Sequence, residues 1–395
     1  MMTSMEKSPC GPTPYLEVLR DNLSDLKDPR LYYKVTYKLE EVLFLVYCSS
    51  VCGLRGYEEI QDFGEERIEW LRKYLPYEDG IPSHDTINRI MGLLDTAELE
   101  ALLVGLANHE IVLPCGSVVN IDGKWLSRSA TAKQQQTKKS EGGKQASIVV
   151  NAYSAAHRAC LASLEVGSKQ GEKQAVDTLL ELLDLSGCLL TMDAGYCFKD
   201  TAALVRSHGA HYFMGLKGNQ PKLHGLAKEL FSGNGASSEF ESRDKGHNRV
   251  EKRRCKVIEL SAETLGREAA KGWEGLSCLV QVERWVHDLT KDERFEECRH
   301  FITSCPMSAT KAAEVARGHW QIENSLHWKL DVCMGEDEST KRSANSAVNF
   351  SVFRKLGLNK LQNWDGGTSK KISIKRKQNK CMANTKKLET VLGFV

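Results

Sequence analysis

The sequence predicts an α/β protein in which a mixed β-sheet with helices on its faces follows a small all-helical domain. Two changes of residue pattern along the 395-residue chain lead to this prediction. Over residues 15–110, apolar side chains recur about every 3.6 positions, which is typical of amphipathic helices. From about residue 116, β-branched and aromatic runs follow one another and then alternate with helical patterns, which is typical of an α/β sheet.

The composition is that of a soluble protein with a substantial core. Hydrophobic residues make up 41% of the chain and charged residues 27%, with a formal net charge of +2. A polyanionic partner would therefore have to be bound by local basic clusters. The thirteen cysteines include no CxxC pair, which favours a reducing cytoplasm. We expect no signal peptide and no membrane span, because the most apolar run, residues 42–54, is shorter than the roughly 20 residues required.

The helical domain is expected over residues 15–110, after a flexible N-terminus at 1–14. Ser83 precedes one helical pattern in a plausible N-cap position. The apolar run at 42–54 indicates a buried helix, in which Cys48 and Cys52 are core thiols. The four patterns read YLEVLRDNLSDL, LEEVLFLVYCSSV, YEEIQDFGEERIEWLRKYL and SHDTINRIMGLLD.

One domain built on a β-sheet, which we expect to be catalytic, is predicted from two segments of the chain, residues 116–220 and 306–360. The first part contains strand, strand, strand, helix, strand, helix and strand patterns in that order. Three antiparallel strands followed by strand–helix alternation are the order of an RNase H-like α/β fold, with a mixed sheet and helices on its faces. The second part opens with one long helix, ATKAAEVARGHWQIENSLHWKLDV.

Two further segments complete the predicted organisation. Residues 221–305 contain β-like runs such as RVEKRRCKVIEL and CLVQVERWVHDL, so we expect a β-rich insertion there. Residues 361–395 form a basic C-terminal tail, which we expect to be poorly ordered from residue 369 onward because it is polar.

Three carboxylates occupy positions that the RNase H-like order brings together. The first and fourth strands of that fold lie side by side, so Asp122 in the first and Asp193 just after the fourth should converge. The late helix can supply Glu323 as the third acid. Carboxylates from separate elements are what two-metal phosphoryl-transfer sites use to hold two Mg²⁺ ions. The alternative for each aspartate alone is an ordinary turn, since Asp122 precedes Gly123.

The long helix also carries two histidines on the stripe of Glu323. His319, Glu323 and His327 are spaced four residues apart. Eight residues of helix separate the two histidines by about 12 Å, too far to bind one zinc ion. We interpret them, with Trp320 and Trp328, as groups that flank a phosphate backbone or a stacked base, although a helix packed by its tryptophans is the alternative.

Several stretches resemble a known family. IDGKWLSRS, TMDAGYCFKDTAALVRSHGAHYFMGLKGNQPKL and RGHWQIENSLHWKLDVCMGEDEST resemble the three acidic blocks of DDE-type bacterial insertion-sequence transposases, including the H-repeat-associated proteins. The start, DPRLYYKVTYKLEEVL and GIPSHDTINRIMGLLD, is similar to that family's N-terminal domain, which suggests binding of DNA ends. The resemblance covers about residues 25–395.

The resemblance implies that Asp122, Asp193 and Glu323 are catalytic and bind two Mg²⁺ ions, for which Mn²⁺ could substitute. It implies cleavage of DNA strands at the ends of an insertion sequence, followed by their transfer to target DNA, without a covalent protein–DNA intermediate. The residues expected to contact DNA beside the acids or in basic stretches are Lys124, Arg128, Lys217, Asn219, Gln220, Arg253, Arg254, Arg317, His319, Asn324 and His327.

Basic clusters are consistent with a DNA partner. Residues 243–256 carry seven Lys or Arg against two acids, and residues 370–387 carry eight and no acid. Such clusters fit contacts with DNA phosphates, although solvated faces are the alternative. We expect double-stranded DNA, both terminal repeats and target, as the partner of a homodimer in the bacterial cytoplasm, at the nucleoid. Rival functions are a DDE nuclease that does not integrate DNA, a non-catalytic DNA-binding relic, and a small-molecule metalloenzyme.

Overall fold

The computed structural model describes residues 14–126, 147–167, 171–233, 235–246, 248–341 and 343–394. These residues form two compact units. Unit 1 comprises residues up to 111 and from 330 onward, and unit 2 comprises residues 112–329 without the stretch 128–144. The expected flexible N-terminus, 1–14, lies outside the described residues except for Pro14.

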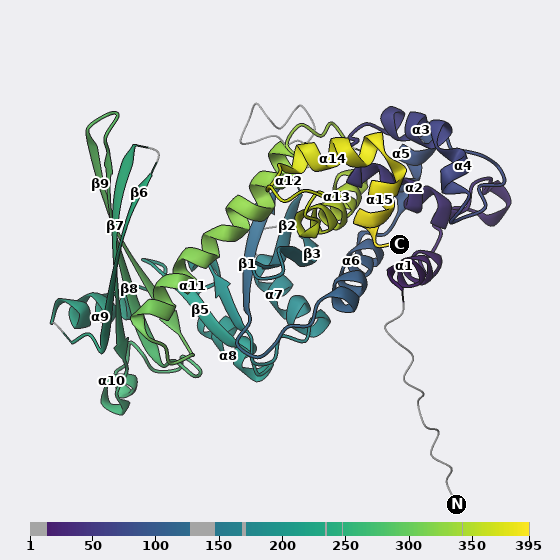
Figure 1. Ribbon diagram of the computed structural model, residues 1–395. Coiled ribbons are helices and arrows are strands. Elements are labelled where there is room, and N and C mark those ends of the chain that lie inside the picture. The colour runs from purple at the N-terminus through teal and green to yellow at the C-terminus, as the bar shows by residue number, and fades with distance from the viewer. Residues whose placement is uncertain are drawn as a thin grey trace, which may run out of the picture. The chain divides into compact units, whose positions relative to one another are not determined.

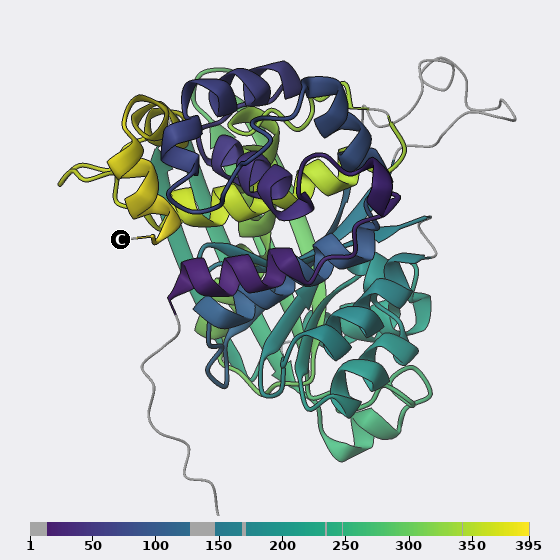
Figure 2. The same ribbon diagram turned by 90° about the vertical axis from the view of Figure 1, so that its right-hand side faces the viewer.

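Unit 1 is helical, as the 3.6-residue pattern predicts (Figures 1 and 2). Ser83 caps its helix as expected, because its Oγ accepts a hydrogen bond from the Thr86 backbone N–H. Its elements are α1 (Tyr15–Ser24), η1 (Tyr32–Lys34), α2 (Leu39–Val51), α3 (Tyr57–Glu66), α4 (Ile68–Leu71), α5 (His84–Leu93), α6 (Thr96–Glu110), α13 (Ser346–Asn363), α14 (Ile374–Ala383) and α15 (Thr385–Leu392).

The core of unit 1 forms around α2 and α13. α2 is buried along nearly its whole length, as its apolar sequence predicts, and Cys48 and Cys52 are buried free thiols within it or at its end. α13 packs against α2, α5, α6, α14 and α15. A helix that is buried all round must satisfy its polar groups internally. Accordingly, Lys355 donates to the Ser351 hydroxyl, which donates to Glu336.

The C-terminal segment differs from the prediction in two respects. Residues 369–395 were expected to be poorly ordered, but they contain α14 and α15, whose apolar residues Ile374, Cys381 and Leu388 are buried. Their helical spacing is present in the sequence, but the many lysines hide it. Residues 330–360 were expected in the catalytic region, but they fold with unit 1. An all-round buried helix such as α13 carries no sequence signal of which core it joins.

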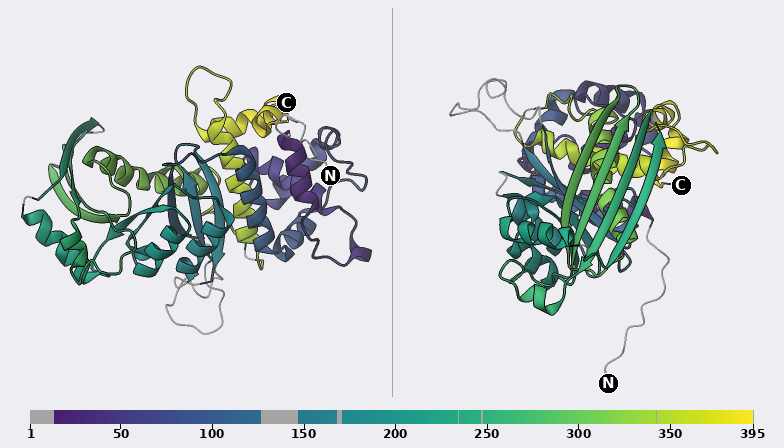
Figure 3. Two further views of the ribbon diagram at one scale, coloured as in Figure 1. Left: turned by 90° about the horizontal axis from the view of Figure 1, so that it is seen from below. Right: turned by 90° about the vertical axis from the view of Figure 1, so that its left-hand side faces the viewer.

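Unit 2 is built on one mixed sheet. Within the described residues its strand order is β3-β2-β1-β4-β5-β9-β8-β7-β6. Figure 3 (right) shows the long strands at the β6 end side by side. The strands are β1 (Val118–Trp125), β2 (Ile148–Ser154), β3 (Ala159–Val166), β4 (Leu189–Met192), β5 (His211–Leu216), β6 (Ser238–Gly246), β7 (Arg249–Glu259), β8 (Cys278–Asp288) and β9 (Glu293–Thr303).

The first five strands confirm the RNase H-like fold. β1, β2 and β3 pair antiparallel, and β4 and β5 add in parallel beside β1. The crossover between β3 and β4 contains α7 (Gly171–Leu182), and that between β4 and β5 contains α8 (Lys199–Ser207). Parallel neighbours need such helical crossovers. The sheet is therefore mixed, as the element order indicates.

The insertion extends this sheet. β9 pairs antiparallel with β5, with Met214 opposite Ile302, and β8, β7 and β6 follow by antiparallel pairing. Residues 221–305 also contain two helices, α9 (Pro221–Ser232) before the strands and α10 (Ala262–Gly266) between β7 and β8. The strands of the insertion therefore begin at residue 238 and end at 303. Pro221 at the first helical position pre-sets the backbone angle for α9.

The late helix is interrupted at the position of the third acid. α11 (Ala309–Gln321) gives way to a π-helical turn, η4 (Ile322–His327), and then to α12 (Trp328–Val332). α11 packs on β1, β4, β6, β7 and β8. In Figure 3 (left), α11 lies on one side of the central strands, and α7 and α8 lie on the other. No helix among the described residues is both long and apolar enough to span a membrane.

Candidate active site

Asp122 and Asp193 project from neighbouring strands at the same level of the sheet. Ile121 of β1 lies opposite Met192 of β4 in the parallel pair, and an aspartate follows each. β4 ends at Met192, whereas β1 continues to Trp125. Asp122 is therefore inside its strand, beyond the end of its pairing with β4, rather than at a strand end. Asp193 instead caps η3 (Ala194–Tyr196), where its Oδ1 accepts a hydrogen bond of 2.7 Å from the Gly195 backbone N–H.

Glu323 reaches the first aspartate from the π-helical turn. Asp122, Glu323 and His327 each offer a ligand atom, and these atoms lie within 4.8 Å of one another. His327 Nδ1 is 3.3 Å from Glu323 Oε2 and 3.9 Å from Asp122 Oδ2. Two carboxylates and an imidazole are a donor set that suits a divalent metal ion. These residues could therefore hold a metal.

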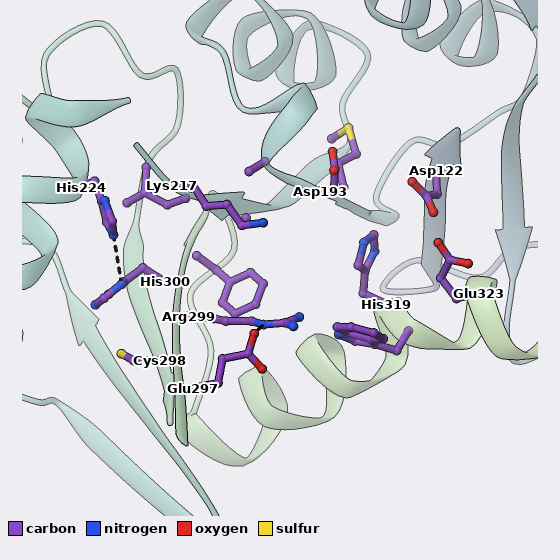
Figure 4. Close-up of a pocket in the computed structure, with 16 residues that line it drawn as sticks. Asp122, Asp193, Lys217, His224, Glu297, Cys298, Arg299, His300, His319 and Glu323 are labelled. Carbon is purple, nitrogen blue, oxygen red and sulfur yellow. Dashed lines mark hydrogen bonds and ion pairs between the residues drawn. The ribbon is translucent and has the colours of Figure 1, made fainter. Parts of the chain in front are cut away.

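All three expected acids line one cavity of about 370 Å³. Figure 4 shows Asp122, Asp193 and Glu323 at one end of it, with His319 beside them. Lys217 and Arg299 line the same cavity, and Arg299 is ion-paired there with Glu297. An acidic cluster that is faced by cations can bind a metal ion and a phosphate group together. The cavity therefore combines the charges that phosphoryl transfer requires.

The metal-free acids have opposite pKa shifts. Burial and the neighbouring Glu323 carboxylate raise the pKa of Asp122 to about 8. A hydrogen bond from His327, helped by one with Asp122, lowers the pKa of Glu323 to about 2. Two carboxylates in contact cannot both ionise without a cation. At neutral pH the pair therefore holds one proton, which a metal ion would displace.

A buried hydrogen-bond network holds His319 at the cavity. The Thr191 hydroxyl donates to Asn120 Oδ1 at 2.7 Å, so its oxygen accepts from His319 Nδ1 at 2.9 Å. Asn120 in turn donates to the Gly318 carbonyl at 3.3 Å. Burial lowers the pKa of His319, which favours the neutral ring. With the proton on Nδ1, Nε2 is the free acceptor of this cavity-lining ring.

Two side chains just after β5 donate hydrogen bonds to the turn that Asp193 caps. Asn219 donates to the Ala194 carbonyl at 2.8 Å, and Gln220 donates to the Cys197 carbonyl at 2.9 Å. These two residues were expected to contact DNA. In the structure, their side-chain amides hold the backbone on both sides of Gly195, in the turn that Asp193 caps. Lys217, also just after β5, is exposed and lines the cavity.

A second cavity of about 530 Å³ lies between the extended strands and α11. It shares the lining residues Glu297, Arg299, Phe301 and Trp320 with the acidic cavity, so the two cavities are neighbours. The Arg299 guanidinium lies 4.5 Å from the centre of the half-exposed Trp320 ring. The expected residues that line this second cavity are Arg253, Arg317 and Asn324.

The arginines of this region are paired with acids. Arg253 contacts Asp244 at 2.8 Å and Glu251 at 2.6 Å. Arg317 lies 3.4 Å from Asp244. Arg254 pairs with Glu239 at 3.1 Å and lines neither cavity. Asp244 and Glu251 are the two acids already counted within residues 243–256, so of these partners only Glu239 of β6 reduces the local excess of positive charge.

Two residues expected to contact DNA are buried instead. Lys124 is 7% exposed, and His327 is 4% exposed. Lys124 pairs opposite Val149 of β2, and the π-helical turn directs His327 toward the carboxylates; neither side chain is exposed. Arg128 lies outside the described residues.

The sequence reasoning missed Asn120, Thr191 and Asn151. Asn120 precedes Asp122 by two positions, and Thr191 precedes Asp193 by two. Residues two apart on a strand point to the same face. The two-residue spacing from each aspartate was therefore the sequence signal that could have identified Asn120 and Thr191. Asn151 lies opposite Asp122 in the β1–β2 pair, a register that the sequence alone did not specify.

Comparisons with known proteins agree with this geometry. Residues 113–360 match the family described as transposase DDE domain, and residues 20–106 match the one described as DDE_Tnp_1-associated. YncI of Escherichia coli O157:H7, named as a candidate transposase, is 35% identical over 384 residues, covering 96% of this chain and 95% of YncI.

A second relative and one solved structure are also similar. The H repeat-associated protein YhhI of Escherichia coli strain K12, also named as a candidate transposase, is 31% identical over 96% of this chain and 98% of its own. The piggyBac transposase synaptic complex with hairpin DNA aligns with a TM-score of 0.44 and 9% identity, covering 96% of this chain and 80% of that one.

Proposed function

Because this chain belongs to the transposase DDE-domain family, we propose that its acidic cavity cleaves DNA strands at insertion-sequence ends and transfers them to target DNA. The observation that carries the proposal is the convergence of Asp122, Asp193 and Glu323 on one cavity that also contains Lys217 and Arg299. The three acids come from a strand, a turn and a helix far apart in the chain. Their convergence is what a metal-dependent phosphoryl-transfer site needs.

The donor set fits a hard divalent ion. Carboxylate oxygens suit Mg²⁺, and Mn²⁺ accepts the same ligands. We propose that Asp122, Asp193 and Glu323 hold two such ions. When bound, the ions would supply Lewis acidity toward phosphate oxygens and would lower the pKa of bound water. The shared proton of Asp122 and Glu323 supports this fit, because the pair lacks a cation that would let both ionise.

The protein's own groups would bind and orient the DNA strand. His319 Nε2 is free to accept a hydrogen bond from the attacking water or 3′-hydroxyl, because His319 Nδ1 donates to Thr191. Lys217 and Arg299 would bind oxygens of the scissile phosphate and its neighbour. The amides of Asn219 and Gln220 would keep Asp193 oriented during the reaction. No side chain needs to become covalently attached to DNA.

Contacts with the rest of the duplex would come from basic residues outside the acidic cavity. In unit 2, Arg253 and Arg317 can exchange their acidic partners for DNA phosphates. In unit 1, α14 and α15 bury their apolar faces and leave a basic face exposed, which supports binding of the DNA backbone without base reading. The exposed cations of this region are Lys370 and Lys371 just before α14, Lys375 and Arg376 on α14, and Lys386 and Lys387 on α15. We further propose that unit 1 recognises the terminal repeats and that a homodimer pairs two ends at the nucleoid.

The test is strand cleavage and joining on labelled terminal-repeat DNA with Mg²⁺. Wild type is compared with Asp122→Ala, Asp193→Ala and Glu323→Ala, and DNA binding is measured for each. Loss of both reactions in all three variants, with binding retained, is the expected result. Cleavage without joining in wild type would instead support a nuclease, and binding without any cleavage would support a DNA-binding relic.

A further inference from the structure

Two buried polar residues lie behind the carboxylates and line neither cavity. Asn151 of β2 is fully buried and pairs opposite Asp122. His327 ends the π-helical turn and is 4% exposed. Asn151 Nδ2 and His327 Nε2 are 3.2 Å apart. Buried polar groups are retained where they have partners, so this pair has a structural or functional role.

The Asn151 side chain determines which nitrogen of His327 carries the proton. The amide nitrogen can only donate, so His327 Nε2 must be the acceptor. The Cys160 thiol, which contacts the Ala162 carbonyl at 3.3 Å, also lies 4.0 Å from Asn151 Oδ1. A weak donor at that oxygen is consistent with the amide nitrogen facing His327. A neutral His327 then has its proton on Nδ1.

The carboxylates on the other side of the ring lead to the same tautomer. His327 Nδ1 faces Glu323 Oε2 at 3.3 Å and Asp122 Oδ2 at 3.9 Å. An ionised carboxylate only accepts hydrogen bonds. Glu323 Oε2 is the nearer of these two oxygens, so it can accept a hydrogen bond from a proton on His327 Nδ1. Both neighbours of the ring therefore favour a proton on Nδ1.

The π-helical turn provides this arrangement. π-helical turns are rare, and they occur frequently at functional sites. Here the turn Ile322–His327 leaves the Glu323 side chain 54% exposed toward the cavity while the His327 side chain is only 6% exposed. The acid is thus accessible to solvent and ions, and the imidazole supports it from the interior.

We propose that Asn151 and His327 are positioning residues: Asn151 holds His327 in its Nδ1–H tautomer, and His327 holds the Glu323 carboxylate toward Asp122. The consequence for DNA cleavage rests on the proposed function, whereas the tautomer and its effect on metal binding do not. The competing role for His327 is that of a metal ligand through Nδ1, which the short distances within the Asp122–Glu323–His327 group would also permit. A ligating nitrogen carries no proton, so the two roles are distinguishable.

The first experiment is ¹⁵N NMR of histidine-labelled protein, with and without Mg²⁺ and in the absence of DNA. The His327 signals are identified by their loss in His327→Gln. We expect a protonated Nδ1 and an unprotonated Nε2 in both samples. An Nε2–H tautomer, or loss of the Nδ1 proton when Mg²⁺ is added, would overturn the proposal.

The second experiment compares variants by Mn²⁺ affinity and by cleavage. The Asn amide mimics Nδ1 of histidine and the Gln amide mimics Nε2, so His327→Asn should keep the donor to Glu323 and His327→Gln should lose it. We expect His327→Asn to stay within about threefold of wild type. His327→Gln and Asn151→Leu should lose about 10–100-fold in Mn²⁺ affinity, the usual effect of removing a residue that orients a ligand.

The comparison includes a control variant and a test of folding. His224→Gln changes a histidine at the far end of the acidic cavity and should leave Mn²⁺ affinity unchanged. Urea midpoints of all variants identify any that fail to fold. Equal losses in His327→Asn and His327→Gln, or no loss in either, would refute the positioning role. Absence of DNA cleavage by wild type would refute the proposed function while leaving the tautomer and Mn²⁺ results intact.

Discussion

Ile121 of β1 lies directly opposite Met192 of β4, and the next residue along each strand is an aspartate. This register makes the first two acids of the site converge, because parallel neighbours keep equivalent residues at the same level. The position of the third acid, Glu323, depends instead on the π-helical turn that follows α11. The site thus depends on the pairing of β1 with β4 and on the π-helical turn.

Metal affinity should depend on pH through Asp122. Its pKa in the metal-free protein is about 8, so a proton competes with the metal below that value. Mn²⁺ affinity should rise by roughly tenfold per pH unit from pH 6 toward pH 8 and should level off above. Fluorescence or calorimetric titration in the absence of DNA measures this. The Asp122→Asn variant should bind more weakly and lose the slope, whereas a flat wild-type profile would contradict the shared proton.

The Thr191 hydroxyl should be important for stability and for His319. Thr191→Val removes the hydrogen bonds to Asn120 and His319 while keeping the shape of the side chain. Leaving buried partners unsatisfied costs about 1–3 kcal/mol, so the free energy of unfolding should fall by that amount. Cleavage should also weaken because His319 loses its anchor.

The matched control for this prediction is Thr191→Ser, which retains the hydroxyl. Urea unfolding and strand-cleavage rates are measured for both variants. If Thr191→Ser is as impaired as Thr191→Val, the methyl group rather than the hydroxyl is responsible, and the network has no role in positioning His319.

The stability of unit 2 should fall in mild acid because of His300. Burial and nearby cationic or imidazole groups lower its pKa to about 4. The unfolded chain, with an ordinary histidine pKa near 6.5, binds more protons between about pH 6.5 and 4, so stability decreases as pH falls through that window. Between pH 7 and pH 5 the loss is on the order of 1–2 kcal/mol, because only part of the proton uptake falls in this range and solvent screens part of the effect.

Denaturant unfolding at pH 7 and pH 5 tests this contribution in wild type and His300→Gln. The variant should be less sensitive to this pH change, because Gln does not titrate. His224, whose ring lies beside His300, contributes to the shift, so His224→Gln should also reduce the sensitivity to pH, but by less than His300→Gln. An unchanged pH dependence in His300→Gln would show that another group is responsible.

The C-terminal helices should be necessary for the stability of unit 1. Leu388 of α15 is fully buried, so Leu388→Ala should reduce the free energy of unfolding by about 2–5 kcal/mol. Lys386, two residues earlier and exposed, is the control, and Lys386→Ala should change it by less than about 0.5 kcal/mol. Thermal and urea unfolding of the full chain measure both. Equal stability of the two variants would mean that the segment behaves as the poorly ordered tail expected from its composition.

The sequence by itself was enough to predict the class of fold and to identify the three acids as candidates. Period-3.6 and β-branched patterns are local, so they predicted the helices of residues 15–110 and the strand order around Asp122 and Asp193 without knowledge of contacts. The order of elements then placed these acids on adjacent strands, because RNase H-like connections leave few alternatives. The resemblance of the acidic blocks added the expected activity.

The tertiary structure decided what surrounds those acids and which unit each late helix joins. Asn151 meets His327 only through strand register and a π-helical turn, and the burial of Lys124 likewise follows from packing that its sequence position does not reveal. α13, whose polar residues are buried among other helices, gave no local sign that it belongs to unit 1. Periodicity reports which residues can share a face, whereas burial and hydrogen-bond partners depend on long-range packing that no local pattern encodes.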